Sequence, residues 1–168
     1  MNVEKVGPVG AEITGIDLSI GNNIPTDKII EAFLKHSVLI FKNQDLDPIS
    51  LSKIALIWGQ PLIHPVFKGI EGHPEIIQIQ NLGEKYHTNA HWHSDVTFER
   101  EPPDATLLYS LEIPDEGGDT LFSNQYLAYE GLDESLREEL ENRTAIHSNL
   151  GVLILAGGDK EDEKEVEH

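Results

Sequence analysis

A histidine and an aspartate two residues apart, His93 and Asp95, are the residues whose types and spacing point most directly to chemistry. On an extended backbone, residues i and i+2 lie on the same side of the chain, so both side chains can reach one cation. Two histidines and one carboxylate hold non-haem Fe(II) and leave positions open for substrate and oxygen. The pair therefore supplies two of the three ligands of such a site.

A structural hydrogen bond between the two side chains is the alternative interpretation, and a tripeptide of this kind arises often by chance. The neighbouring sequence favours metal binding, because five of the eight histidines fall in one stretch: His64, His73, His87, His91 and His93. Histidine is the commonest metal ligand in proteins. On a regular strand His91 shares a side with His93 and Asp95, so spacing alone leaves it open as a competing ligand.

The composition is that of one globular domain with a strong acidic excess. The chain has 168 residues, 39% of them hydrophobic and 25% charged, and 30 acidic residues against 12 Lys and Arg give a net charge of −18. That charge disfavours nucleic acids and anionic membranes as partners. There is no cysteine for disulfides or thiolate sites. The sequence shows neither a membrane-spanning run nor a secretory signal, so it predicts a cytoplasmic protein.

The patterns along the chain predict helices first and strands later. The predicted strands lie at residues 10–18, 38–41 (buried), 75–80, 105–111, 119–122 and 144–148. One helix begins near Pro25, is capped by Thr26 or Asp27 and has an apolar face of Ile29, Ile30, Phe33 and Leu34. A second follows Asp47 as N-cap, with Pro48 in its first position, and ends at residues 59–61. A third covers 123–142 with a break at 131–133, where Asp133 caps the second piece.

Residues 83–89 read as a polar loop, and residues 157–168 read as an acidic, mobile tail, which leaves residues 1–156 as the domain. No glycine-rich phosphate loop follows a strand. The order of elements predicts an α+β fold with a β core flanked by helices.

Several motifs together resemble the taurine dioxygenase family of Fe(II)/2-oxoglutarate-dependent oxygenases. They are Trp92-His93-Ser94-Asp95-Val96-Thr97-Phe98, Pro102-Pro103, Gly117-Gly118-Asp119-Thr120-Leu121-Phe122 and Ala128-Tyr129. The resemblance extends upstream to His64-Pro65-Val66 and to residues 38–44, and it covers residues 7–150. It implies a double-stranded β-helix, or jelly roll, with flanking helices and with the C-terminal part of the core missing from this chain.

The resemblance also implies a role for individual residues, with Fe(II), 2-oxoglutarate and O2 as cofactor and co-substrates. His93 and Asp95 match the first two iron ligands, and Thr120 matches the threonine that binds a carboxylate of 2-oxoglutarate. His64 matches a histidine that contacts the anionic group of the substrate. From the residues alone, Thr120 is an ordinary strand residue after a turn, and His64 is a loop histidine. Trp92 and Phe98 are expected to pack around the ligand pair.

Two further positions, Phe67 and His91, concern the substrate. Phe67 stands where the taurine enzyme has a tyrosine, and His91 stands where it has an asparagine. Both changes alter polar contacts to the substrate, and such contacts are hard to replace without loss of discrimination. The expected substrate is therefore a small anionic compound of the taurine, alkylsulfonate or sulfate-ester type, with taurine itself in doubt.

The family's third iron ligand and its 2-oxoglutarate-binding arginine are expected downstream of His168. His147 matches a position that is not a ligand, and none of Arg100, Arg137 and Arg143 lies in the family's arginine motif. The sequence therefore predicts the N-terminal part of a longer enzyme, with little turnover alone. The alternative is a metal-binding or interaction half-domain completed by a partner chain, including a homo-oligomer that supplies His147 or His168. A cupin-like metalloenzyme with another metal is a third reading.

Overall fold

The computed structural model describes residues 1–19, 24–80 and 91–168, so the predicted loop at 83–89 lies outside the described residues. The chain is mixed α+β, as expected, and divides into two compact units. Unit 1 comprises Met1–Gly59 and Leu108–Glu139, and unit 2 comprises Gln60–Leu107 and Leu140–His168. Each unit is described by itself.

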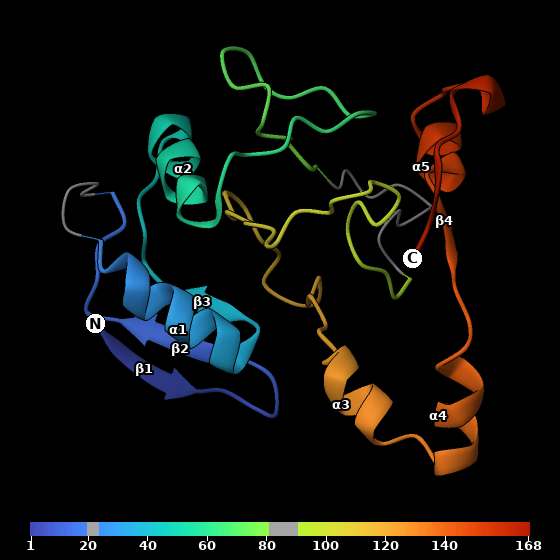
Figure 1. Cartoon of the computed structure of the whole chain (residues 1–168). Helices are drawn as coiled ribbons and strands as arrows, with labels where there is room; N and C mark the ends of the chain where they lie inside the picture. The colour runs from blue at the N-terminus through green and yellow to red at the C-terminus, as the bar shows by residue number, and fades with distance from the viewer. Residues whose placement is uncertain (20–23, 81–90) are drawn as a thin grey trace. The chain divides into compact units, whose positions relative to one another are not determined.

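Unit 1 is built on a three-stranded sheet covered by one helix (Figure 1). Strands β1 (Asn2–Lys5) and β2 (Ala11–Thr14) are antiparallel, and β3 (Leu39–Phe41) pairs parallel to β2. Helix α1 (Thr26–His36) makes the crossover between β2 and β3. The predicted strands at 10–18 and 38–41 are confirmed over shorter ranges, although Ile40 is 39% exposed. Strand β1, with every residue exposed, carries no apolar alternation that would predict it.

The core of unit 1 forms between β2 and α1. Ala11 and Ile13 are buried on one face of β2, and Ile29 and Ala32 are buried on α1. Leu34, predicted for this face, is 78% exposed. It lies five residues after Ile29, which places it about 140° around the helix axis from that residue. The capping prediction for α1 is also wrong, because the N-cap is Pro25 and no side chain accepts a hydrogen bond there.

The second helix begins and ends where the sequence predicts. Helix α2 (Pro48–Ala55) follows Asp47, whose Oδ1 accepts a hydrogen bond from the Ser50 N–H at 2.7 Å. Hydrogen bonds from Ser50 hold the pKa of Asp47 below its usual value. A 3-10 turn, η1 (Leu56–Trp58), extends the helix to Gly59, whose φ of 120° is suited to glycine.

The Gln44 side chain ties the loop after β2 to the end of β3. Its Oε1 accepts from the Leu18 N–H at 2.8 Å, and its Nε2 donates to the carbonyls of Ile16 and Lys42 at 3.2 and 2.9 Å. The Tyr109 hydroxyl accepts from the Leu46 N–H at 3.1 Å and donates to the Gln44 carbonyl at 3.3 Å. These bonds attach the later segment of unit 1 to its sheet.

The predicted broken helix is confirmed as α3 (Gln125–Glu130) and α4 (Glu134–Leu140). Asp133 caps α4 by accepting from the Leu136 N–H at 2.9 Å. Arg137 links the two helices, because its Nη2 donates to the Glu130 carbonyl at 2.9 Å and its guanidinium lies 5.5 Å from the centre of the Tyr129 ring.

Unit 2 contains a two-stranded antiparallel ribbon of β4 (Ile146–Ser148) and β5 (Glu165–Glu167). Helix α5 (Leu150–Leu155) and the 3-10 turn η2 (Lys160–Asp162) lie between the strands in sequence. The strand predicted at 144–148 is thus confirmed. The segment after residue 156 contains η2 and β5, and its assignment as a separate, mobile tail stays a prediction.

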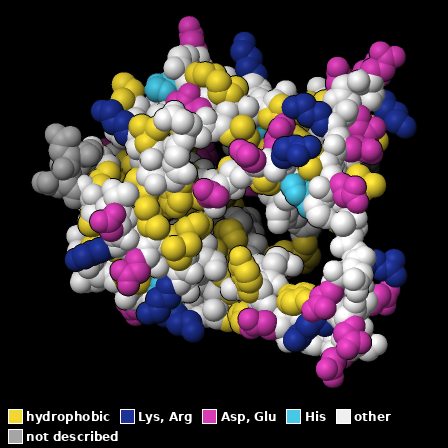
Figure 2. All heavy atoms as spheres, viewed as in Figure 1, with side chains coloured by type: hydrophobic (Ala, Val, Ile, Leu, Met, Phe, Trp, Pro, Cys, Tyr) yellow, Lys and Arg dark blue, Asp and Glu magenta, His cyan; other side chains and the backbone are white. Residues whose placement is uncertain are grey.

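Three predicted strands, at 75–80, 105–111 and 119–122, are wrong for the described residues, where these segments have no strand partner. Without a neighbour to complete the hydrogen-bond ladder, an apolar extended segment stays irregular. Their apolar side chains are largely exposed: Ile79 67%, Leu108 68% and Leu121 71%. Hydrophobic side chains lie among acidic ones on the surface that Figure 2 shows. The described residues form no closed jelly roll, and none of their helices is long and apolar enough to cross a membrane.

We expect Gln44→Ala to destabilise the chain by about 1–3 kcal/mol, because it leaves partly buried backbone groups without partners. Urea unfolding followed by circular dichroism measures this free energy. Gln60→Ala, at an exposed position, is the control and should unfold like the wild type. Equal stability of the two variants would contradict the role of Gln44.

We expect the stability difference between wild type and Asp47→Ala to depend on pH. A carboxylate with a lowered pKa in the folded state stabilises above its unfolded pKa of about 3.9 and loses this contribution as the pH falls through the folded value. Thermal melts at pH 7 should therefore show the variant as less stable, and the difference should shrink near pH 3. Asp47→Asn keeps an uncharged acceptor and serves as the control. A difference that is the same at both pH values would argue against the cap.

Candidate functional site

His93 and Asp95 face each other in unit 2. The distance between His93 Nε2 and Asp95 Oδ1 is 3.3 Å, and the two side chains are 50% and 47% exposed. The segment is not a regular strand, because a turn occupies residues 95–98. The sequence places both side chains on one side, and they do meet, although a local bend and not a strand brings them together.

Hydrogen bonds also hold the two atoms that are not part of this contact, His93 Nδ1 and Asp95 Oδ2. His93 Nδ1 donates to the carbonyl of His91 at 2.7 Å, which leaves Nε2 as the ring nitrogen that faces Asp95. The Thr106 hydroxyl donates to Asp95 Oδ2 at 2.9 Å, so Oδ1 is the carboxylate oxygen that faces His93. Partners of this kind fix the orientation of metal ligands and raise their basicity. The two remaining atoms, Nε2 and Oδ1, are the pair that lies 3.3 Å apart.

Val96, directly after Asp95, has a backbone φ of 55°. A β-branched residue rarely adopts this left-handed conformation, and such strain costs about 1–3 kcal/mol. The turn is closed by a hydrogen bond from the Glu99 N–H to the Val96 carbonyl at 3.0 Å. The strained residue lies in the turn at residues 95–98 that begins with Asp95. Sequence reasoning missed it, because valine gives no signal for a positive φ.

His64 packs between two aromatic rings. Its ring centre lies 4.9 Å from that of Phe67 and 6.4 Å from that of Phe98, which is buried. Its Nδ1 accepts from the N–H groups of Val66 and Phe67 at 3.1 and 3.0 Å. Burial lowers the pKa of His64, although the carboxylates of Asp95 and Glu99 act in the opposite direction. The ring is therefore neutral at pH 7 and carries its proton on Nε2, where it can donate to a ligand.

The structure gives less support to the other residues that the sequence predicts for the site. The side chain of His91 is exposed, and its contribution to the ligand pair is its backbone carbonyl. Phe98 is buried as expected, but Trp92 is 71% exposed and does not pack around the pair. Thr120 is exposed and belongs to unit 1, so its role toward 2-oxoglutarate stays a prediction.

Two more histidines support the segment that follows Asp95. His147 Nδ1 lies 2.8 Å from the Thr97 hydroxyl, and His168 Nε2 donates to the Thr97 carbonyl at 2.9 Å. The two imidazole rings are 5.2 Å apart in an edge-to-face arrangement. Both histidines thus bond to Thr97, and the structure offers neither as a third ligand to the pair.

The side chains of His93 and Asp95 provide part of the ligand set that iron requires. An imidazole nitrogen and a carboxylate oxygen are two members of the set that holds Fe(II), and both are oriented by other groups. Among residues 1–19, 24–80 and 91–168, no group of three or more His, Cys, Asp or Glu side chains is placed to hold a metal ion. The described residues therefore fit two positions of the three-ligand face.

Comparisons with a family model and with individual proteins agree on one family. The model of the "Taurine catabolism dioxygenase TauD, TfdA family" matches residues 2–164. An alpha-ketoglutarate-dependent sulfate ester dioxygenase of Pseudomonas putida is 37% identical over 146 residues, which cover 85% of this chain and 48% of that protein. An alkylsulfatase of Acinetobacter baylyi is 38% identical over 145 residues, covering 85% of this chain and 45% of that protein.

A solved structure agrees with these matches. The crystal structure of a taurine dioxygenase from Burkholderia xenovorans superposes with a TM-score of 0.75 at 33% identity, over 87% of this chain and 52% of that one. This chain thus spans about half the length of the relatives it matches.

We expect Thr106→Val to weaken metal binding at the pair by about 10–100-fold, because Asp95 Oδ2 loses the donor that orients it. Anaerobic titration with Fe(II), or with Co(II) followed by its visible absorption, measures the affinity. Thr106→Ser should restore it.

Thr144→Val is the matched control, because Thr144 donates to the Glu167 carboxylate at 2.6 Å in the same kind of bond. Its metal affinity should equal that of the wild type. Unchanged affinity in Thr106→Val would show that the hydroxyl does not position the ligand.

Proposed function

Because this chain belongs to the taurine catabolism dioxygenase TauD, TfdA family, we propose that it serves the 2-oxoglutarate-dependent hydroxylation of a small anionic substrate. The observation that carries the proposal is the oriented pair, with His93 Nε2 and Asp95 Oδ1 3.3 Å apart and their other atoms held by His91 and Thr106. Since the chain spans about half the length of its relatives, the activity is proposed for the completed site.

His93 and Asp95 would hold Fe(II), and the Thr120 hydroxyl would bind a carboxylate of 2-oxoglutarate. With O2 the bound cofactors supply the oxidation, in which 2-oxoglutarate becomes succinate and CO2 while one substrate C–H becomes C–OH. The protein's own residues fix the ligands, orient the substrate and exclude water. Phe98, buried against His64, contributes an apolar wall on this side.

The proposed substrate is a sulfonate or a sulfate ester. Two similar proteins are described as a sulfate ester dioxygenase and an alkylsulfatase. The neutral His64 offers an N–H donor to an anionic oxygen, and its bonds to Val66 and Phe67 hold the ring in place. Phe67 adds no hydroxyl and His91 replaces an amide, so we place taurine below alkyl sulfates and sulfonates as a substrate.

We propose that the fold is completed as a jelly roll, in which the unpaired segments 105–111 and 119–122 become strands. Their exposed apolar residues, such as Leu108 and Leu121, support this. The third ligand and the arginine for 2-oxoglutarate would come from a further segment of the same polypeptide or from a partner chain. A second copy of this chain is one such partner.

The pair is tested by anaerobic Fe(II) titration of the 168-residue chain. We expect weak binding that His93→Ala or Asp95→Ala abolishes, because an isolated ligand holds the ion poorly. The matched control is His73→Ala, since His73 Nδ1 contacts Glu75 Oε1 at 3.2 Å in a second pair with the same spacing.

His73→Ala should bind iron like the wild type. Binding that survives in His93→Ala, or that is lost in His73→Ala, would refute the assignment. Tight stoichiometric binding by the short chain would instead indicate a site completed between copies. Substrate-dependent succinate formation, measured with hexyl sulfate and with taurine, then compares the two substrate types in the completed enzyme.

A further inference from the structure

The β4–β5 ribbon presents two histidines on one face. His147 lies opposite Val166 in the ribbon, and Ala145 and His168 exchange both backbone hydrogen bonds at 3.0 Å. In an antiparallel pair, residues directly opposite each other lie on the same face, and so do residues two apart on one strand. His147 and His168 are therefore diagonal neighbours on this face, and their rings are 5.2 Å apart.

Both rings bond to the same residue, Thr97, which follows Asp95 by two positions. His147 Nδ1 lies 2.8 Å from the Thr97 hydroxyl, and His168 Nε2 donates to the Thr97 carbonyl at 2.9 Å. The first contact restrains the side chain of Thr97, and the second restrains its peptide plane. Because the two contacts come from different strands, they hold both the position and the rotation of this residue.

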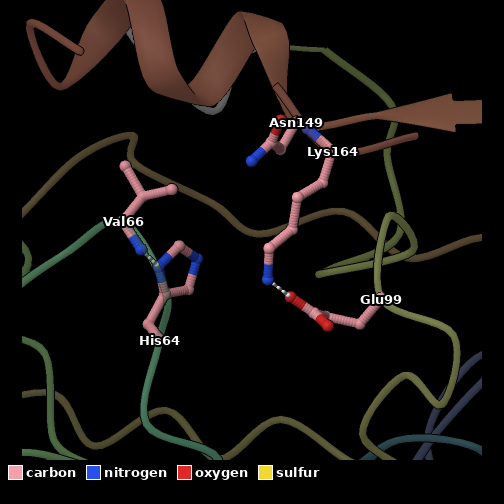
Figure 3. A network of polar contacts seen from close by, with 5 residues as sticks. All are labelled: His64, Val66, Glu99, Asn149 and Lys164. Carbon is pink, nitrogen blue, oxygen red and sulfur yellow. Dashed lines mark hydrogen bonds and ion pairs between the residues drawn. The ribbon is translucent and has the colours of Figure 1, made fainter. Parts of the chain in front are cut away.

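A third contact joins the ribbon to the residue that ends the turn. Just before β5, the Lys164 N–H donates to the buried Asn149 Oδ1 at 2.7 Å, and Lys164 Nζ lies 3.0 Å from Glu99 Oε1. Figure 3 shows the Lys164 side chain extending from beside Asn149 to Glu99. The Lys164 side chain is 53% exposed, and an exposed ion pair contributes little. This contact is therefore secondary to the two histidines.

The turn needs a restraint from outside because Val96 is held at a φ of 55°. A β-branched residue keeps this conformation only where the surrounding structure imposes it. The bond from the Glu99 N–H to the Val96 carbonyl involves only atoms after the N–Cα bond of Val96, so it leaves φ free. That angle is fixed when the chain is held on both sides of it. Thr106 holds Asp95 on one side, and the two histidines hold Thr97 on the other.

We propose that His147 and His168 are positioning residues for Asp95. By holding Thr97 they keep Val96 in its left-handed conformation and so fix the direction of the Asp95 carboxylate. The inference rests on the function proposed above, in which Asp95 is a ligand of Fe(II). It gives the β4–β5 ribbon a role at the site without making either of its histidines a ligand.

The test compares His147→Leu with His147→Asn in the 168-residue chain. Leucine removes the contact with Thr97, whereas the asparagine amide places a polar atom near the position of the ring Nδ1. In the metal-free protein, a strong nuclear Overhauser effect between the Hα and the amide proton of Val96 marks its positive φ. We expect this signal in the wild type and in His147→Asn, and we expect its loss in His147→Leu.

Anaerobic titration with Co(II), followed by its visible absorption, is the second measurement. Binding should be about 10-fold weaker in His147→Leu, because a misdirected carboxylate is a poorer ligand. His147→Asn should restore the affinity and the absorption spectrum of the wild type, which a general loss of stability would not predict.

Ser148→Ala is the matched control on the same strand. The Ser148 hydroxyl donates to Glu163 Oε1 at 2.6 Å, so the variant loses a bond of the ribbon segment and leaves both contacts with Thr97 in place. It should keep the Val96 signal and the wild-type affinity for Co(II).

His168→Leu gives a second test from the other strand, should His147→Leu fail to fold. His168 is exposed, and the substitution removes the bond to the Thr97 carbonyl while the backbone pairing with Ala145 remains. It should also weaken the Val96 signal and Co(II) binding. His168→Gln offers an amide donor in place of the ring Nε2 and should restore both.

This inference and the proposed function fail in different ways. If both leucine variants keep the Val96 signal, or lose it while Co(II) still binds as tightly as to the wild type, the positioning role is wrong and the ligand pair stands. If the leucine variants lose the signal, but Asp95→Ala binds Co(II) like the wild type, the ribbon fixes the turn and the assignment of Asp95 as a ligand is wrong.

Discussion

The structure depends above all on where extended segments find hydrogen-bond partners. Strand β2 has a neighbour on each side, and its alternate residues Ala11 and Ile13 become the buried core of unit 1. Segments 105–111 and 119–122 have comparable apolar patterns but no partner among the described residues, and their side chains stay exposed. A backbone N–H or carbonyl that lacks a partner must remain in water, and this keeps the attached side chains near the surface as well. Pairing, rather than hydrophobicity alone, therefore decides which apolar residues are buried.

The ligand pair escapes this constraint because it is held by local bonds. His93 bonds to the carbonyl two residues before it, and Asp95 bonds to Thr106, eleven residues later. Neither bond needs a completed sheet. The left-handed Val96 adds a fixed bend between Asp95 and Thr97, and His147 and His168 hold Thr97 from the β4–β5 ribbon. The two side chains proposed as ligands are thus oriented without a third, so that less ordering entropy would be lost in binding the proposed metal.

The features that sequence predicts well are those with a local cause. Asp47 and Asp133 were predicted as helix caps because a carboxylate satisfies exposed N–H groups, and both accept the expected hydrogen bonds. His93 and Asp95 meet as predicted, although through a local bend and not through the extended backbone on which the prediction rested. Trp92 and the later strands were misassigned because their burial depends on distant neighbours, which a pattern of apolar residues does not identify, whereas Leu34 is exposed because of its position around the helix axis. Asn149 gave no signal in the sequence, since its burial arises from the pairing of β4 with β5 and from its bond to Lys164.

The net charge of −18 limits how the anionic substrate proposed above could be recognised. At long range the protein repels such a molecule, although at physiological ionic strength this field decays over about 8 Å. Attraction must therefore come from short-range contacts. A neutral His64 with its proton on Nε2 provides a directed donor, and Lys164 is already paired with Glu99. Because a neutral donor is a weak anchor for an anion, the proposed binding also needs apolar contacts. The aliphatic chain of the proposed alkyl sulfate could make such contacts, whereas the ammonium group of taurine could not.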